Sequence, residues 1–228
     1  MRYHAIIFDL DGTLVDTAPD VLQSANHTLR KLGMREITLE EARRSIGPGP
    51  DNFARIVLPE GQLHRYDEFI RLFRQHYRDH CLDSTRPFPG VPEVLEALAG
   101  VPKAVASNKP REYTQAILEA LELSRHFDTV VGPEDVARVK PAPDMLLLAA
   151  RRLGVEPAHT LMVGDTDNDV LAARSAGMPV CAVTWGYSPE EHLRSLHPDF
   201  LIDEPFQLLE IVGLPATAGA ALRAASNR

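Results

Sequence analysis

From Lys103 onward, short runs of apolar residues alternate with stretches whose apolar residues recur at helical spacing. Apolar residues three and four positions apart share one face of a helix, whereas short apolar runs between turn signals fit buried strands. This alternation is typical of βαβ units and predicts an α/β fold, a Rossmann-like parallel sheet core with helices on both faces. The predicted strands cover residues 5–8, 103–107, 129–132, 160–164 and 179–184.

Residues 17–87 have a different pattern, because no strand-like run is evident among them. Apolar residues follow helical spacing from Val21 to Leu32 and again from Leu63 to Tyr77. Thr38 and Glu41 have the spacing of a capping box. We therefore predict a helical insertion after the first strand, with a turn-rich return near Pro87. The expected division is a core domain of residues 1–16 and 88–228 and a helical domain of residues 17–87.

The composition limits the class of protein and its partners. The 228 residues are 44% hydrophobic and 25% charged, which is ordinary for a globular protein. A formal net charge of −8 argues against nucleic acid as a partner, although a local cation can still hold a small anion. Two cysteines suggest packed thiols in a reducing compartment. No run is long enough for a membrane span or a secretory signal, so we expect a cytoplasmic protein without a membrane partner.

Asp9 and Asp11 are the most informative residues of the chain. They follow the first predicted strand and lie two positions apart, so their side chains start on the same face. Like charges beside an apolar strand are unfavourable without a partner. A hard cation such as Mg²⁺, which prefers oxygen ligands, would relieve the repulsion. A solvated turn containing Gly12 is the alternative interpretation.

Three further polar segments fall at or beyond the ends of predicted strands, where open parallel sheets form their sites. Ser107-Asn108-Lys109 ends the second strand, and Lys140 follows a run at 134–139 that we interpret as strand-like. The segment Gly164–Asp169 ends the strand 160–164 and opens a helix. Each segment alone has an ordinary explanation, such as a helix cap or a solvated lysine. Their order at successive strand ends favours a single site.

In these four segments the chain resembles the haloacid dehalogenase superfamily of phosphotransferases, from Ile6 to about Tyr187. Asp9–Thr13, Ser107, Lys140 and Gly164–Asp169 match the four motifs of that family in order. The resemblance implies that the helical insertion is the family's small α-helical cap, inserted after the first strand. The amino-acid sequence around the motifs is most similar to the phosphoglycolate phosphatase branch, including residues 16–20, 107–110, 140–143 and 172–178.

The resemblance implies a role for each motif residue. Asp9 would attack phosphorus and form an aspartyl-phosphate, and Asp11 would act as the general acid and base. Ser107 and Lys140 would hold and neutralise the phosphoryl group. Asp9, the backbone carbonyl of Asp11, and Asp165 would bind Mg²⁺, while Asp169 would orient metal-bound water or Lys140.

The implied function is a Mg²⁺-dependent phosphomonoester hydrolase for a small phosphorylated metabolite, with 2-phosphoglycolate as the foremost candidate. Arg44 or Lys109 could supply a cation for an acidic substrate. The remaining candidates for substrate contact are chosen by position. They are Thr13, Thr17, Asp20, Gly49 and Asn108, beside Ser107 and Lys140.

Several alternatives stay open at this point. A phosphomutase of the β-phosphoglucomutase type would use the same Asp9 and Asp11, and a phosphatase could equally take a sugar phosphate or pyrophosphate. A haloalkanoate dehalogenase is disfavoured by Asp11 and Thr13, and a receiver module by the helical insertion. The sequence does not distinguish a monomer from a homodimer. The Ala-rich tail after Gly213 is expected to fray.

Overall fold

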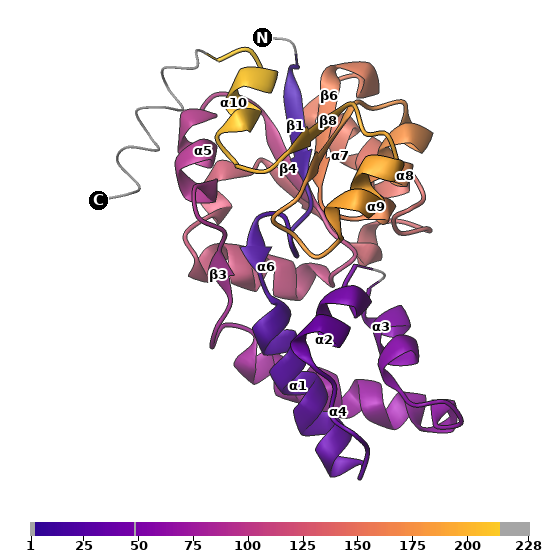
Figure 1. Cartoon of the computed structure of the whole chain (residues 1–228). Helices are drawn as coiled ribbons and strands as arrows, with labels where there is room; N and C mark the ends of the chain where they lie inside the picture. The colour runs from indigo at the N-terminus through magenta and orange to yellow at the C-terminus, as the bar shows by residue number, and fades with distance from the viewer. Residues whose placement is uncertain (1–2, 48, 215–228) are drawn as a thin grey trace.

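The computed structural model describes residues 3–47 and 49–214, which form a mixed α/β structure with a helical part at one end (Figure 1). In this part of the chain, a six-stranded parallel sheet has the order β5-β4-β1-β6-β7-β8. Its strands are β1 (Ala5–Phe8), β4 (Lys103–Ala106), β5 (Thr129–Val131), β6 (Thr160–Gly164), β7 (Val180–Val183) and β8 (Phe200–Ile202).

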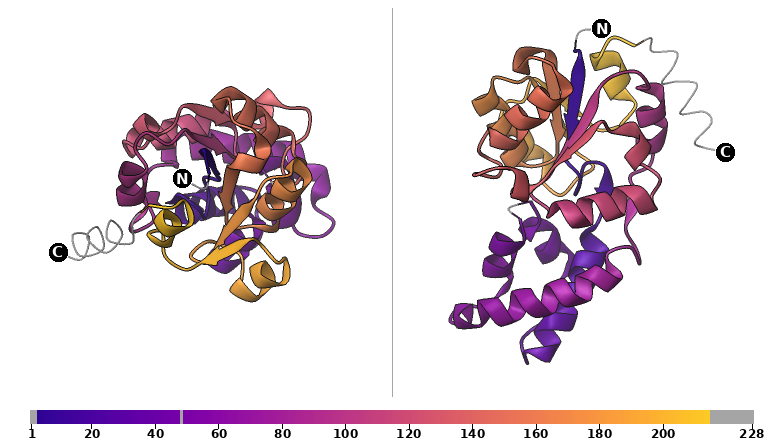
Figure 2. Two further views of the ribbon diagram at one scale, coloured as in Figure 1. Left: turned by 90° about the horizontal axis from the view of Figure 1, so that it is seen from above. Right: turned by 180° about the vertical axis from the view of Figure 1, so that it is seen from behind.

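Helices cover both faces of this sheet, as two further views show (Figure 2). Because side chains alternate along a strand, Ile6 and Phe8 face one apolar cluster and Ile7 faces the other. Residues of α5, α6 and α10 fill the first cluster, and residues of α7, α8 and α9 fill the second. The predicted fold class is thereby confirmed. The bounds are α5 (Val91–Ala97), α6 (Arg111–Ala120), α7 (Asp144–Leu153), α8 (Asp167–Ala176), α9 (Glu190–Ser195) and α10 (Gln207–Ile211).

The strand order fixes where polar loops can meet. Going along the chain, the core strands run outward from β1 to β5 on one side, and then return to β6 and run out to β8 on the other. The sheet therefore has its topological switch point beside β1, where ligands bind at the carboxyl ends of the strands. Phe8, Ala106 and Gly164 end the three neighbouring strands β1, β4 and β6.

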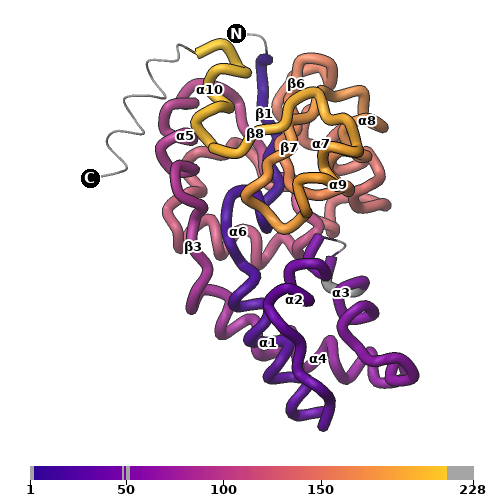
Figure 3. The backbone as a smooth tube through the Cα atoms, in the orientation of Figure 1, coloured from indigo at the N-terminus to yellow at the C-terminus, as the bar shows by residue number. Residues whose placement is uncertain are grey.

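A helical insertion lies next to that edge and is joined to the sheet by a small two-stranded ribbon, as the tube view shows (Figure 3). The ribbon pairs β2 (Val15–Asp16) with β3 (Arg86–Pro87) in antiparallel register. The insertion has its own apolar cluster, in which α1 packs against α4 through residues such as Leu29 and Phe69. Its helices are α1 (Ala18–Lys31), α2 (Leu39–Ser45), α3 (Pro50–Val57) and α4 (Tyr66–His80).

Several predicted elements are wrong in detail. The segment 134–139 is not a strand but continues from a 3₁₀ turn, Pro133–Asp135, into irregular chain. Its charged residues could not enter a sheet that is buried on both faces. The ribbon strands β2 and β3 and the three-residue strand β8 were not predicted, because two or three residues are too short to show a period. The helix expected over 63–77 begins as a 3₁₀ turn at Leu63–Arg65.

Local sequence explains several element ends. Thr38 accepts a hydrogen bond from the Glu41 backbone, and the Glu41 side chain accepts one from Thr38, which confirms the predicted capping box. Gly154 and Gly177 end α7 and α8 in the left-handed conformation. Within the described ranges, every helix is too short or too polar to traverse a bilayer. The Ala-rich tail lies outside the described residues.

Candidate active site

Asp9 leaves β1 at the switch point, and its backbone N–H donates to Val163 O on β6 at 2.9 Å. The following turn contains Gly12, whose positive φ of +82° is strained for any residue with a Cβ. A Cβ at this position would also overlap the Asp165 carboxylate. The glycine therefore lets the first loop approach the loop after β6.

Lys140 lies between two buried carboxylates. Its Nζ is 2.9 Å from Asp9 Oδ1 and 2.7 Å from Asp169 Oδ1. Burial alone would lower the pKa of Lys140, but the charges of Asp169 and Asp9 outweigh it and move the pKa upward. The lysine is thus a fixed cation in contact with Asp9. A loop rather than a strand end brings it there, which corrects the expected position.

Asp165 and Asp169 enter the site from β6 and the first turn of α8. Asp165 Oδ1 accepts from Thr13 Oγ1 at 2.9 Å, and its Oδ2 accepts from the Tyr187 backbone at 2.8 Å. Asp169 Oδ2 accepts from both Thr166 N and Thr166 Oγ1, while its Oδ1 accepts from Lys140. Both oxygens of Asp169 are therefore engaged by protein groups.

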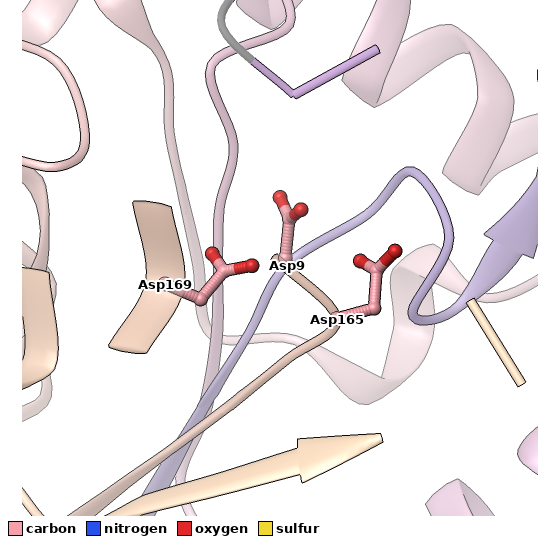
Figure 4. A group of neighbouring side chains, drawn as sticks. All are labelled: Asp9, Asp165 and Asp169. Atoms are coloured by element: carbon pink, nitrogen blue, oxygen red, sulfur yellow. The ribbon is translucent and has the colours of Figure 1, made fainter. Parts of the chain in front are cut away.

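The carboxylates of Asp9, Asp165 and Asp169 gather at one point, with ligand atoms within 4.8 Å of one another (Figure 4). Burial, opposed by Lys140 and reinforced by Asp169 and Asp11, raises the pKa of Asp9 to about 6. Burial and the neighbouring Asp169 and Asp9 also raise the pKa of Asp165. Lys140 alone does not compensate this crowding. The donor set is all oxygen and fits a hard divalent cation, for which Asp9 and Asp165 would be the available carboxylate ligands.

The Asp11 carboxylate points away from that cluster. Its Oδ1 accepts from Thr17 Oγ1 at 2.6 Å, and its Oδ2 lies 3.0 Å from Lys109 Nζ. Burial would lower the pKa of Lys109, but Asp11 and Tyr77 reverse this and move it upward. The side chain of Asp11 is thus oriented by groups from the helical insertion and from the loop after β4.

Ser107 and Asn108 end β4 with different local roles. Ser107 is buried, lines the same pocket as Asp9 and Asp11, and accepts a hydrogen bond from Lys109 N at 3.3 Å. Asn108 Nδ2 donates to Gly47 O and to Lys140 O, both at 2.9 Å, while its Oδ1 accepts from Lys140 N at 3.0 Å. One amide thus connects the α2–α3 loop of the insertion with the loop that carries Lys140.

A pocket lies between the strand ends and the inner side of the insertion, and Asp9 and Asp11 form part of its wall. The insertion supplies mostly apolar and aromatic groups to it, together with Arg74. Gly49 reaches the pocket as expected from its position. The other residues of the wall are Val21, Ser45, Ile46, Gly47, Phe53, Phe73, Tyr77, Ser107, Asn108, Lys109, Pro110 and Tyr113.

Five of the predicted substrate-contact residues do not line this pocket, namely Thr13, Thr17, Asp20, Arg44 and Lys140. Asp20 is buried, but its carboxylate accepts hydrogen bonds from Ser84 N, Thr85 N and Thr85 Oγ1. It therefore ties the start of α1 to the return segment. Arg44 is exposed and pairs with Glu40 on its own helix. Thr13 and Thr17 contact Asp165 and Asp11 and thus support other side chains of the site.

Reading the sequence did not identify several residues of the site. Tyr187 joins the site to the insertion, because its hydroxyl accepts from Thr17 N and Ala18 N and donates to Asp16. Arg74, Tyr77 and Tyr113 line the pocket from α4 and α6. Spacing gave no signal for them, since they follow the same apolar stripes as core residues.

Comparisons with known proteins agree with this arrangement. A family model described as haloacid dehalogenase-like hydrolase matches residues 6–183. The chain is 37% identical over 209 residues to a phosphoglycolate phosphatase of Aquifex aeolicus, covering 91% of this chain and 95% of that protein. It is 34% identical over 233 residues to a phosphoglycolate phosphatase of Escherichia coli, covering 92% of each.

A solved structure described as a predicted phosphoglycolate phosphatase from Haemophilus somnus superposes with a TM-score of 0.86 at 31% identity. The superposition covers 93% of this chain and 99% of the Haemophilus somnus chain. Fold and site together define a hydrolase with a Rossmann-like parallel sheet core and a carboxylate-rich centre. The chain belongs to the haloacid dehalogenase-like hydrolase family. The predicted resemblance to the phosphatases of that superfamily, and to their phosphoglycolate phosphatase branch, is confirmed.

Proposed function

We propose that this protein is a Mg²⁺-dependent phosphomonoester hydrolase that acts on 2-phosphoglycolate through an aspartyl-phosphate. The observation that carries the proposal is the contact between Asp9 and Lys140 at the switch point, with Asp11 oriented separately toward the pocket. The names of the relatives support the choice of substrate. The helical insertion, residues 17–87, would act as the cap over a core of residues 1–16 and 88–228.

In the first step an Asp9 carboxylate oxygen would attack phosphorus, and the ester P–O bond would break. Lys140 would offset the negative charge shared by Asp9 and the phosphoryl oxygens. Ser107, which lines the same pocket as Asp9, would donate a hydrogen bond from its hydroxyl to one of these oxygens. The three groups come from separate loops that the sheet holds together.

Asp11 would give its proton to the leaving alkoxide in the first step and take one from water in the second. Water would attack the phosphorus of the aspartyl-phosphate, break its bond to Asp9 and release inorganic phosphate. Thr17 and Lys109 hold the Asp11 side chain at the pocket wall.

Magnesium would be held by Asp9, Asp165 and the backbone carbonyl of Asp11. Asp169 would orient Lys140 by accepting a hydrogen bond from its ammonium group. When bound, it would supply positive charge against the phosphoryl oxygens. Thr13 and the Tyr187 backbone orient Asp165 for this role. The same contacts would hold the site together before the cation binds.

The test is release of free phosphate from 2-phosphoglycolate by the purified protein with and without Mg²⁺. We expect release of phosphate from 2-phosphoglycolate that requires Mg²⁺. When glucose 1-phosphate is offered instead, we expect no isomerised sugar phosphate. Sugar phosphates and pyrophosphate serve as comparison substrates. Absence of Mg²⁺-dependent phosphate release from every phosphoester would refute the proposal.

A further inference from the structure

Lys109 is a cation at the pocket wall that the proposed chemistry does not use directly. It is buried, its Nζ is 3.0 Å from Asp11 Oδ2, and it lies 5.0 Å from the centre of the Tyr77 ring. An ammonium group has three N–H donors; Asp11 takes one, and the Tyr77 hydroxyl lies next to the ammonium as a second, weaker partner. A buried ammonium is costly unless further acceptors are present. The pocket side of Lys109 therefore favours an anionic group.

Two tyrosine hydroxyls are buried at the same wall. Tyr77 Oη and Tyr113 Oη are inaccessible to solvent. Each lies near a cation, Lys109 for Tyr77 and Arg78 for Tyr113, but neither hydroxyl has an acceptor for its own proton among the described residues. Their rings meet edge to face, with centroids 5.2 Å apart. A buried hydroxyl without a partner costs free energy that a bound acceptor would recover. The Tyr77 hydroxyl thus adds a neutral donor beside the Lys109 ammonium, and the Tyr113 hydroxyl adds another on the same wall.

The surroundings of these donors are apolar. Phe53, Phe73, Val21 and Ile46 line the pocket and offer no hydrogen bond from their side chains. A low-polarity wall strengthens the attraction between a cation and an anion, because little solvent competes. Arg74, also on the wall, adds to the positive field. An acidic group entering this part of the pocket would meet cations and donors, with Asp11 as the nearby carboxylate.

We propose that Lys109, with the hydroxyls of Tyr77 and Tyr113, forms a carboxylate-binding subsite for the leaving group of the substrate. The proposal rests on the proposed phosphatase function and specifies its substrate class. Asp11, the proposed proton donor, must face the leaving oxygen, and Lys109 is in contact with Asp11. A carboxylate one carbon from that oxygen therefore falls within reach of Lys109. The subsite selects phosphomonoesters whose ester carbon carries a carboxylate.

The experiment compares two substrates with the same two-carbon skeleton, 2-phosphoglycolate and ethyl phosphate, in which a methyl group replaces the carboxylate. Steady-state kinetics are measured for the full chain and for Lys109→Met and Tyr113→Phe. For the full chain we expect kcat/KM to favour 2-phosphoglycolate. Lys109→Met should reduce this preference about 10²-fold, as expected for loss of a desolvated charge pair. Tyr113→Phe should reduce it about threefold to tenfold, mainly through KM.

Arg44→Ala is the matched control, because it removes an exposed cation from the insertion outside the pocket. Its substrate preference should equal that of the unaltered chain. If Lys109 only positions Asp11, Lys109→Met will slow both substrates equally and the subsite proposal is overturned. Equal turnover of both substrates by the unaltered chain would overturn it as well.

Lys109→Arg provides a second test if Lys109→Met does not fold, because the arginine retains the positive charge. It should keep most of the preference for 2-phosphoglycolate. Competitive inhibition by glycolate, measured on p-nitrophenyl phosphate, should weaken about tenfold or more in Lys109→Met and stay unchanged in Arg44→Ala. Failure of the phosphatase function itself is distinguishable, because then no substrate releases phosphate.

Discussion

The two walls of the pocket differ in how their polar groups are satisfied. At the strand ends, Lys140 joins Asp9 to Asp169, and Asp165 accepts from Thr13 and Tyr187. On the insertion side, aromatic rings dominate, and buried tyrosine hydroxyls lack a well-aligned partner. A preorganised charge network suits the phosphoryl group common to all phosphoesters. Unsatisfied donors among apolar groups suit a leaving group that varies between substrates.

Substitutions in the charge network around Asp9 should affect turnover of every phosphoester, whereas substitutions of Lys109, Tyr77 or Tyr113 should affect the choice among them. Asp9→Asn removes the nucleophile and should give the largest effect. We expect kcat to fall at least about 10⁴-fold for 2-phosphoglycolate and for ethyl phosphate alike. The melting temperature should not fall, because a buried like charge is also removed. Substantial residual turnover would reject the covalent route through Asp9.

Gly12→Ala tests the close approach of the first loop to Asp165. The new Cβ would overlap the Asp165 carboxylate, so we expect a loss of about 10²-fold in kcat/KM. Gly33→Ala is the matched control, because Gly33 also has a positive φ but open space around it. It should lower the melting temperature by a few degrees through backbone strain and leave kinetics unchanged. Equal kinetics for the two variants would contradict the argument.

Asn108→Ala tests the connection between the two walls. It removes three hydrogen bonds, two to the Lys140 backbone and one to Gly47 O. We expect kcat/KM to fall about tenfold to 10²-fold, since Lys140 and the α2–α3 loop lose a shared partner. Asn26 provides the control, because its amide bridges Ile37 N and Ile37 O far from the pocket. Asn26→Ala should lower the melting temperature without changing kinetics.

The smallest expected effect is a pH dependence of stability in the insertion. The rings of His27 and His76 are tilted by 35° with centroids 3.9 Å apart, and His76 stacks on His80 at 4.2 Å. Burial and neighbouring cationic or histidine groups lower the pKa of His27 and of His76. Near the ordinary histidine pKa of about 6.5, the unfolded chain therefore binds more protons than the folded chain. The contribution of the neutral histidines to the free energy of unfolding is present above that pH and lost below it.

The measurement is the melting temperature at pH 7.5 and pH 5.5 for the unaltered chain and for His76→Gln. We expect a smaller decrease on acidification in His76→Gln, because one titrating group is removed. Other groups titrate in both proteins and cancel in the difference. Identical decreases would exclude a contribution from the stacked histidines.

Much of the fold was readable from the sequence. Apolar runs at 5–8 and 160–164 coincide with β1 and β6, and those at 103–107 and 129–132 exceed β4 and β5 by one residue. Buried parallel strands are nearly continuous apolar runs, so neighbouring residues carry their signal. The strand predicted at 134–139 was wrong. This segment is not a continuous apolar run, because charged residues lie between its apolar residues and keep it outside the sheet.

Sequence alone determined which residue types gather at the strand ends. Asp9, Asp11 and Asp165 are fixed there by short spacing from strands that must lie side by side in a parallel sheet. Only the tertiary structure decided what faces the pocket from the insertion and from α6. Arg44 and Asp20 turn away from it, while Tyr77 and Tyr113 turn into it. Helical spacing defines an apolar face, but the rotation and packing of whole helices decide which neighbour that face meets.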